Sequence, residues 1–241
     1  MGADECNINP YHTYSSERLW NELIFSEYGV EVTGSGWDYR SRKAILAALK
    51  AVGSKFAETT EEEDSASEAF RNVYHTNDES LVFLWNENCW GCRPVTCYET
   101  GEMSGSCKPK YGFATGTHLI EFASLTDVGF VSDDVLFQRW TNNMIHELGH
   151  VFDYRIGEAG RNSISGDLLN RPDGFRTGGG LGTMTWQMSG DETPSEIFAD
   201  MFLGHIGTGS QSMWADDHFG IVRANHMDSR MRAWIALAIN Q

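Results

Sequence analysis

The chain has 241 residues, of which 41% are hydrophobic and 12% are aromatic, and its formal net charge is -16 at pH 7. This composition is typical of one globular domain with a sizeable core and excludes an intrinsically disordered chain. The acidic charge disfavours nucleic acid and anionic membrane surfaces as partners, and no apolar run is long enough to span a membrane.

The residue pattern predicts strands and one helix in the first half of the chain. Residues 28–33 alternate like a strand, residues 41–56 have helical spacing, and residues 80–85 and 117–125 again have the pattern of strands. The acidic run 58–68 is interpreted as an exposed loop or helix start, because its spacing does not match a calcium-binding EF-hand loop. We expect the last of the strands to lie nearest the active site and to bind a substrate backbone by strand addition.

Four of the five cysteines fall in a glycine-rich segment between two predicted strands. Only one Cys-x-x-Cys pair is present, so a zinc ribbon is disfavoured and disulfide bonds are expected. Disulfides imply an extracellular protein, although no signal peptide is visible at the N-terminus. The pairing stays open among Cys6, Cys89, Cys92, Cys97 and Cys107.

The segment His146-Glu147-Leu148-Gly149-His150 has the spacing of a zinc site on a helix. Residues four apart on an α-helix lie about 6 Å apart along its axis and on one face, so both imidazoles can bind one tetrahedral ion. Glu147 lies beside them and is well placed to take a proton from a metal-bound water as a general base. A chance match, or a pair of buried core histidines, is the alternative interpretation.

A long amphipathic helix is predicted around this motif. Residues 132–134 offer N-cap candidates, apolar residues recur at helical spacing, and Gly157 is a plausible C-terminal stop. Polar side chains gather on one side of this helix, which we expect to face a cleft. They are Asn142, Asn143, His146, His150 and Asp153.

A catalytic zinc site needs a third protein ligand and one open position. Asp153 is the nearest carboxylate, but a ligand three residues after His150 on the same helix would crowd one face of the ion. No HExxHxxGxxH pattern follows, so the metzincin arrangement is excluded.

Glu196 is a better candidate for the third ligand. It lies at the start of a second predicted helix with Pro194 in the first position, and Asp200 stands one turn later on the same face. The alternative role for Glu196 is structural, because Thr193 and Glu196 have the spacing of a capping box.

Residues 146–154 (HELGHVFDY) and 195–202 (SEIFADMF) together resemble the two active-site helices of gluzincin metallopeptidases. They are most similar to the group that includes the anthrax lethal factor catalytic domain and the Pro-Pro endopeptidases. The resemblance implies a zinc-dependent endopeptidase in which His146, His150 and Glu196 bind one Zn²⁺ and Glu147 activates a zinc-bound water. It also implies that Asp200 holds a histidine ligand through its second ring nitrogen.

The same resemblance implies the architecture. We expect an α+β, zincin-like metallopeptidase domain with a small mixed sheet, the HExxH helix and a helical C-terminal half. One catalytic domain would cover residues 1–241, with a sheet subregion over about 1–155 and a helical subregion over about 156–241. Residues 216–240 are predicted to be largely helical.

One departure from the group concerns the scissile carbonyl. Its members carry a Tyr shortly before the Glu ligand, whereas residues 185–189 read Thr-Trp-Gln-Met-Ser. The oxyanion donor is therefore open among Tyr154, His205, His218 and His226, and the glycine-rich stretch 174–182 is either a flap beside the cleft or a plain linker. The missing Tyr also keeps two alternatives open, namely an inactive or binding-only protein with a zincin-type metal site and a zinc hydrolase of another bond.

Overall fold

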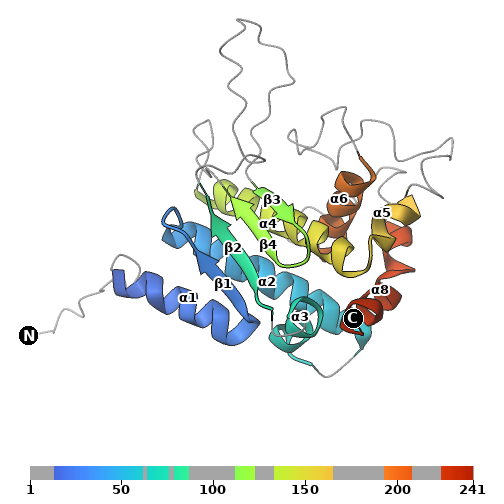
Figure 1. The fold of residues 1–241 in the computed structure, drawn as a ribbon, viewed down its shortest axis with the longest axis horizontal. Helices are drawn as coiled ribbons and strands as arrows, with labels where there is room; N and C mark the ends of the chain where they lie inside the picture. Colours follow the sequence, from blue (N-terminus) through green and yellow to red (C-terminus); the bar gives the residue numbers. More distant parts are fainter. Residues whose placement is uncertain are drawn as a thin grey trace, which may run out of the picture.

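The structure, a computed structural model, describes residues 14–61, 64–75, 79–86, 112–122, 133–164, 193–207 and 224–240. The described chain is α+β with one small mixed sheet, as predicted, and it is mostly helical in both halves. The strands are β1 (Val30–Thr33), β2 (Leu81–Trp85), β3 (Gly112–Thr115) and β4 (Leu119–Phe122) (Figure 1). The helices are α1 (Tyr14–Tyr28), α2 (Tyr39–Thr60), α3 (Ala66–Tyr74), α4 (Asp133–Arg155), α5 (Ala159–Ser163), α6 (Pro194–Ile206) and α8 (Met231–Ile239).

The sheet has the strand order β1-β2-β4-β3. β1, β2 and β4 run parallel, while β3 pairs antiparallel with β4 through a turn at residues 116–118, where Gly116 has a φ of +67°. β4 is therefore paired on both sides, and the prediction that it is the strand nearest the active site is wrong. The edge strand that contacts α4 is β3, which the sequence pattern did not reveal.

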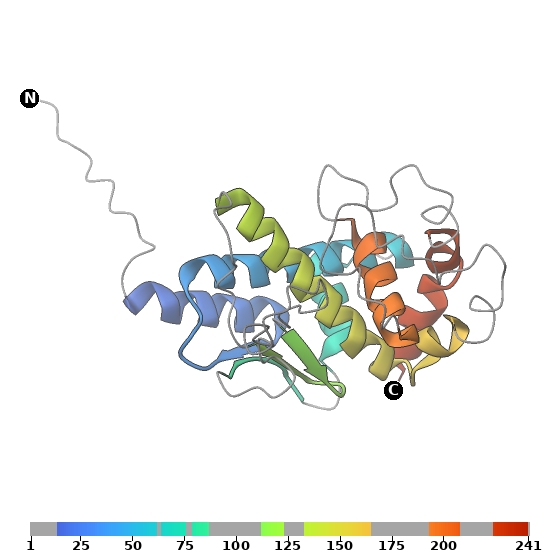
Figure 2. The same cartoon turned by 90° about the horizontal axis from the view of Figure 1, so that it is seen from above.

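The helices pack on one face of the sheet, as the view in Figure 2 shows. Alternate strand residues point into this layer: Val30 and Val32 are buried, and the rings of Phe83 and Phe122 stack with centroids 5.9 Å apart. Antiparallel β3 comes last in this order and borders α4, so the sheet places a strand edge beside the motif helix.

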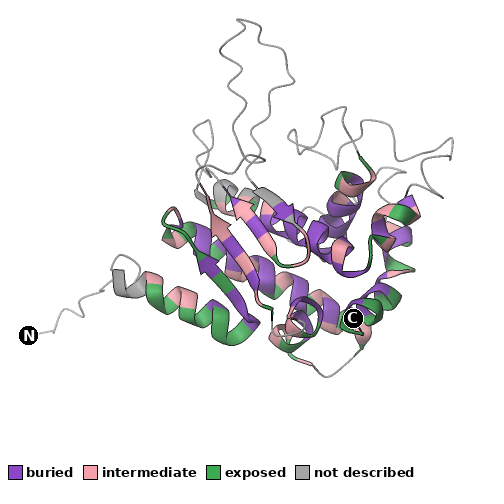
Figure 3. Cartoon of the chain, in the orientation of Figure 1, coloured by how far each residue is buried: buried purple, intermediate pink, exposed green. Residues whose placement is uncertain are grey.

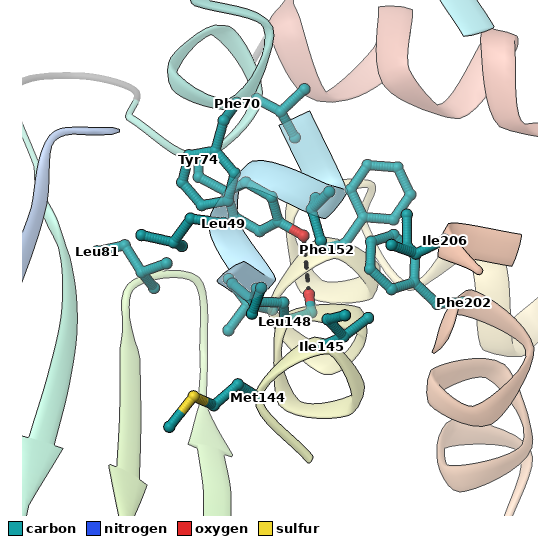
Figure 4. Packing of buried hydrophobic residues seen from close by; sticks show 14 of the residues in the cluster. Leu49, Phe70, Tyr74, Leu81, Met144, Ile145, Leu148, Phe152, Phe202 and Ile206 are labelled. Atoms are coloured by element: carbon teal, nitrogen blue, oxygen red, sulfur yellow. Dashed lines mark hydrogen bonds between the residues drawn. The ribbon is translucent and has the colours of Figure 1, made fainter. Parts of the chain in front are cut away.

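An aromatic cluster joins four helices in the core. Phe152 of α4 lies 5.5 Å from Phe56 of α2 and 5.3 Å from Phe202 of α6, measured between ring centroids. Tyr74 of α3 donates a hydrogen bond from its hydroxyl to the backbone carbonyl of Leu148, at 3.0 Å (Figure 4). Since these groups are buried, they fix α4 against α6 and α2 at the level of the HExxH motif.

Helix α1 was not predicted, and its surface explains why. Ile24 and Tyr28 are buried, but Leu19 is 63% exposed and Phe25 is 50% exposed, so no clean apolar face marks the helix (Figure 3). Burial is concentrated on α2, α4 and α6.

The predicted helices are confirmed with small shifts of their ends. Asp38 caps α2 by accepting from the backbone amide of Ser41, α4 ends before Gly157, and α6 begins at Pro194. Of the stretch 216–240, residues 224–228 and α8 are helical, and 216–223 lie outside the described residues. No helix in the described ranges is long and apolar enough to cross a lipid bilayer.

Candidate metal centre

The site forms where the C-terminal half of α4 packs against α6 (Figures 1 and 2). Gly149 lies at this contact: a Cβ atom there would stand 3.1 Å from Ala199 Cα and 3.1 Å from Phe202 Cβ. A glycine inside a helix costs about 1 kcal/mol relative to alanine. The gain is a close approach of the two helices, which brings residues of α6 to the two histidines of α4.

His146, His150 and Glu196 converge at this contact. His146 Nε2 lies 3.2 Å from His150 Nε2 and 3.2 Å from Glu196 Oε2, and Glu196 Oε1 lies 3.6 Å from His150 Nε2. Ligands placed about 2.0–2.1 Å from a tetrahedral zinc ion are separated from one another by about 3.3 Å. The two imidazole nitrogens and the carboxylate therefore have the spacing and the chemistry of three zinc ligands.

The pKa shifts of these groups indicate that the site stabilises a positive charge between the side chains. Burial lowers the pKa of His146, but hydrogen bonds with Asp200 and Glu196 outweigh it and hold this pKa well above its ordinary value. Burial raises the pKa of Glu196, yet hydrogen bonds with His146 and His150 prevail and hold it well below its usual range. A divalent cation bound by the same atoms would replace the proton on His146.

Each histidine also contacts α6 through its other ring nitrogen. Asp200 Oδ1 lies 2.8 Å from His146 Nδ1, the contact that the resemblance implied, and Ser195 Oγ lies 3.1 Å from His150 Nδ1. When each Nδ1–H donates to its oxygen partner, the Nε2 lone pairs are free to bind a metal. Ser195 was not predicted as part of the site, because a serine in the first turn of a helix is common and carries no separate signal.

We expect Ser195→Ala and Asp200→Asn each to weaken zinc affinity by about 10- to 100-fold, since partners that orient a metal-binding histidine typically have effects of this size. Competition with a chromophoric chelator measures the affinity. The matched control is Ser26→Ala in the exposed part of α1, which should leave the affinity unchanged. Wild-type affinity in both site variants would show that neither oxygen orients its histidine.

Glu147 lies beside the two histidines and is only 6% exposed. Its Oε2 accepts a hydrogen bond from the backbone amide of Ala114 in β3, at 3.0 Å, so the edge strand holds its carboxylate. Burial raises the pKa of Glu147, and the nearby imidazoles of His150 and His146 oppose this shift only in part. A carboxylate with a raised pKa is a better proton acceptor near neutral pH. This backbone partner has no signature in the sequence.

Only one of the two hydrogen bonds of a capping box is present at Thr193 and Glu196. Thr193 is the N-cap of α6 and its hydroxyl accepts from the Glu196 backbone amide at 3.3 Å. The Glu196 carboxylate contacts the two imidazoles, whereas in α3 the Glu68 carboxylate returns to the Ser65 amide and completes a capping box. The side chain of Glu196 is 51% exposed, so the group is reachable by water on this side.

Asp153 does not reach the metal centre. It is fully buried and forms an ion pair with Arg161 of α5. Its Oδ1 also accepts a hydrogen bond from the Arg161 backbone amide, at 3.0 Å. The end of α4 thus uses this carboxylate to anchor α5. Among the described residues, the one group of histidine, cysteine and acidic side chains arranged to hold a metal is His146, His150 and Glu196.

Three of the four candidate oxyanion donors have partners elsewhere. Arg161 lies over the Tyr154 ring, 4.6 Å from its centroid, and has a side-chain hydrogen bond with Tyr154. His205 Nδ1 lies 3.0 Å from Asp228 Oδ1, and His226 Nε2 lies 2.9 Å from Ser163 Oγ. Outside the described residues lie His218, the stretches 174–182 and 185–189, and Cys6, Cys89, Cys92, Cys97 and Cys107.

Comparison of the chain with family models, with curated proteins and with solved structures gives no match to any of them. The geometry of the site and the motif that it contains are therefore the basis for a function.

Proposed function

We propose that this protein is a zinc-dependent endopeptidase of the gluzincin type, with a zincin-like catalytic domain. His146, His150 and Glu196 would bind one Zn²⁺, Glu147 would act as general base, and Asp200 would orient His146. The observation that carries the proposal is the convergence of these three ligand atoms at 3.2–3.6 Å, with Glu147 on the same helix. The HExxH motif alone predicted two ligands and the base, and the packing of α6 adds a third ligand of suitable chemistry.

The chain's own groups can carry the proton through peptide hydrolysis. The Glu147 carboxylate accepts a proton from water as the water oxygen bonds to the scissile carbonyl carbon. The protonated Glu147 then donates to the amide nitrogen, so that the C–N bond breaks and a neutral amine leaves. Zinc, when bound, supplies the positive charge that lowers the pKa of water and polarises the carbonyl.

A peptide substrate is favoured by the strand beside the base. Among the described strands β3 lies at the edge of the sheet, and it contacts α4 on the side where its Ala114 amide holds Glu147. An extended peptide can pair with a free strand edge through its backbone, which places a peptide bond near the neighbouring helix. We assign to β3 the substrate-binding role that the sequence pattern predicted for β4, which is paired on both sides.

Metal content by mass spectrometry tests the proposal directly. We expect one zinc ion per wild-type chain, and loss or strong weakening of zinc binding in Glu196→Ala, because two imidazoles alone leave the ion without a third protein ligand. Thr193→Ala is the matched control: it removes the cap of the same helix, at a cost of about 1 kcal/mol in folding stability, and should retain zinc.

The opposite pattern would identify Glu196 as a capping residue only. Zinc retained in Glu196→Ala would move the search for the third ligand to His218 and the other candidates outside the described residues, because Asp153, His205 and His226 are paired elsewhere. Cleavage of a mixed peptide library by the zinc-loaded wild type then tests endopeptidase activity. Zinc binding without cleavage would favour a binding-only protein or a hydrolase of another bond.

A further inference from the structure

Asn143 of α4 carries a buried hydrogen-bond donor without a partner. Its side-chain Nδ2 is inaccessible to water and, within the described residues, forms no hydrogen bond. Its neighbour Asn142 differs, since its Oδ1 accepts from Gln138 Nε2 at 3.5 Å. A buried amide donor without an acceptor is rare in folded proteins and is costly, so a folded chain that retains one calls for a reason.

The position of Asn143 on α4 supplies a reason. At about 100° per residue, His146, Glu147 and His150 lie about 60°, 40° and 20° away from Asn143 around the helix axis. Asn143 therefore lies on the same face as the metal ligands and the base, about 6 Å along the axis before Glu147. The residue as a whole is partly exposed, although its Nδ2 is not.

The other described groups with a buried, unpartnered side-chain atom do not share this placement. Trp85 Nε1 lies at the end of β2, His205 Nε2 lies on a ring whose Nδ1 is paired with Asp228, and Arg161 is held in its ion pair with Asp153. Three of the four candidate oxyanion donors are likewise engaged away from the metal centre. Asn143 is thus the described side chain that combines a free donor with the face of α4 that carries the site.

We propose that Asn143 is a specificity-determining residue that donates a hydrogen bond to a side-chain oxygen of the substrate residue next to the scissile bond. This inference rests on the proposed peptidase function. The folded chain already carries the cost of desolvating the donor, so an acceptor that reaches Nδ2 gains a hydrogen bond with little further desolvation of the protein.

The acidic groups of the site favour a neutral oxygen as the acceptor on the substrate. Glu147, Glu196 and Asp200 are acidic groups of the same site, and the whole chain has a formal net charge of -16. These charges disfavour a carboxylate beside the scissile bond. The favoured substrates are therefore peptides with Asn, Gln, Ser or Thr at this position.

Folding stability gives a test that needs neither metal nor substrate. In metal-free protein, Asn143→Leu keeps the approximate size of the side chain and removes the unpaired donor, so we expect its Tm to rise by about 2–4 °C. Asn142→Leu removes a paired neighbour on the same helix and should lower Tm. A lower Tm in Asn143→Leu would show that Nδ2 has a partner in the resting protein and would overturn the proposal.

Cleavage of a mixed peptide library by the zinc-loaded proteins tests specificity. We expect Asn143→Leu to lose about tenfold in kcat/KM on peptides with Asn, Gln, Ser or Thr next to the cleaved bond, and to retain its rate on peptides with Ala or Leu there. Asn143→Asp should move the preference toward Lys and Arg. If the wild type and all variants cleave the library with the same profile, the role of Asn143 is overturned and the proposed function stands. If the wild type cleaves no peptide, both the proposed function and the role of Asn143 are overturned.

Discussion

Replacement of Glu147 by glutamine is expected to lower the rate of peptide hydrolysis by about 100- to 10,000-fold while zinc stays bound. A positioned general base contributes rate factors of this size. Glu147 is not one of the three converging ligands, so the glutamine variant should still bind one zinc ion per chain. The Ala114 amide can still donate to the glutamine side-chain oxygen, which keeps the side chain in place.

The stability of this variant should not fall. Burial raises the pKa of Glu147, so the folded protein favours the protonated carboxyl group. The stability that this group contributes at low pH is lost as the pH rises through the raised pKa. A neutral glutamine avoids this loss, so Tm at neutral pH should equal or exceed that of the wild type. Glu27→Gln on the exposed part of α1 is the control and should retain full activity. Activity of Glu147→Gln close to wild type would remove Glu147 from the mechanism.

The long-range geometry of the site was only partly visible in the sequence. The motif on α4 and the first turn of α6 have strong local patterns, so their helices were predicted from spacing, and the pairing of Glu196 with the two histidines was implied by the resemblance to gluzincin metallopeptidases. Ser195 and the Ala114 amide were not, since both act through contacts between elements distant in the chain. A backbone donor on a four-residue strand has no residue signature at all.

The sheet shows the same limit. Apolar patterns located β1, β2 and β4, but strand order depends on which edges pair, and the short strand β3 lies in a segment without clear alternation. The hairpin at Gly116 makes β3 the edge next to α4 and moves β4 inside. Helix α1 was missed because its exposed apolar residues, Leu19 and Phe25, blur the face that Ile24 and Tyr28 bury.

Gly149 links the fold to the site, and a bulky residue there should damage both. Gly149→Ala places one carbon at 3.1–3.2 Å from Ala199 and Phe202, which a shift of a few tenths of an ångström accommodates. Alanine also gains about 1 kcal/mol of helix propensity, so the net change in stability should be small. Gly149→Val adds two further methyl groups at this contact, and overpacking should cost about 2–3 kcal/mol.

The metal separates this effect from simple destabilisation. If valine forces α6 away from α4, Glu196 moves away from His146 and His150, and zinc affinity should fall at least about tenfold. Gly157→Ala is the matched control, because its φ of +62° strains any other residue while no atom lies within 4 Å of the added carbon. It should lower Tm and leave zinc affinity unchanged. Wild-type zinc affinity in Gly149→Val, measured by chelator competition, would show that the close approach of the two helices at Gly149 is not what brings Glu196 to the histidines.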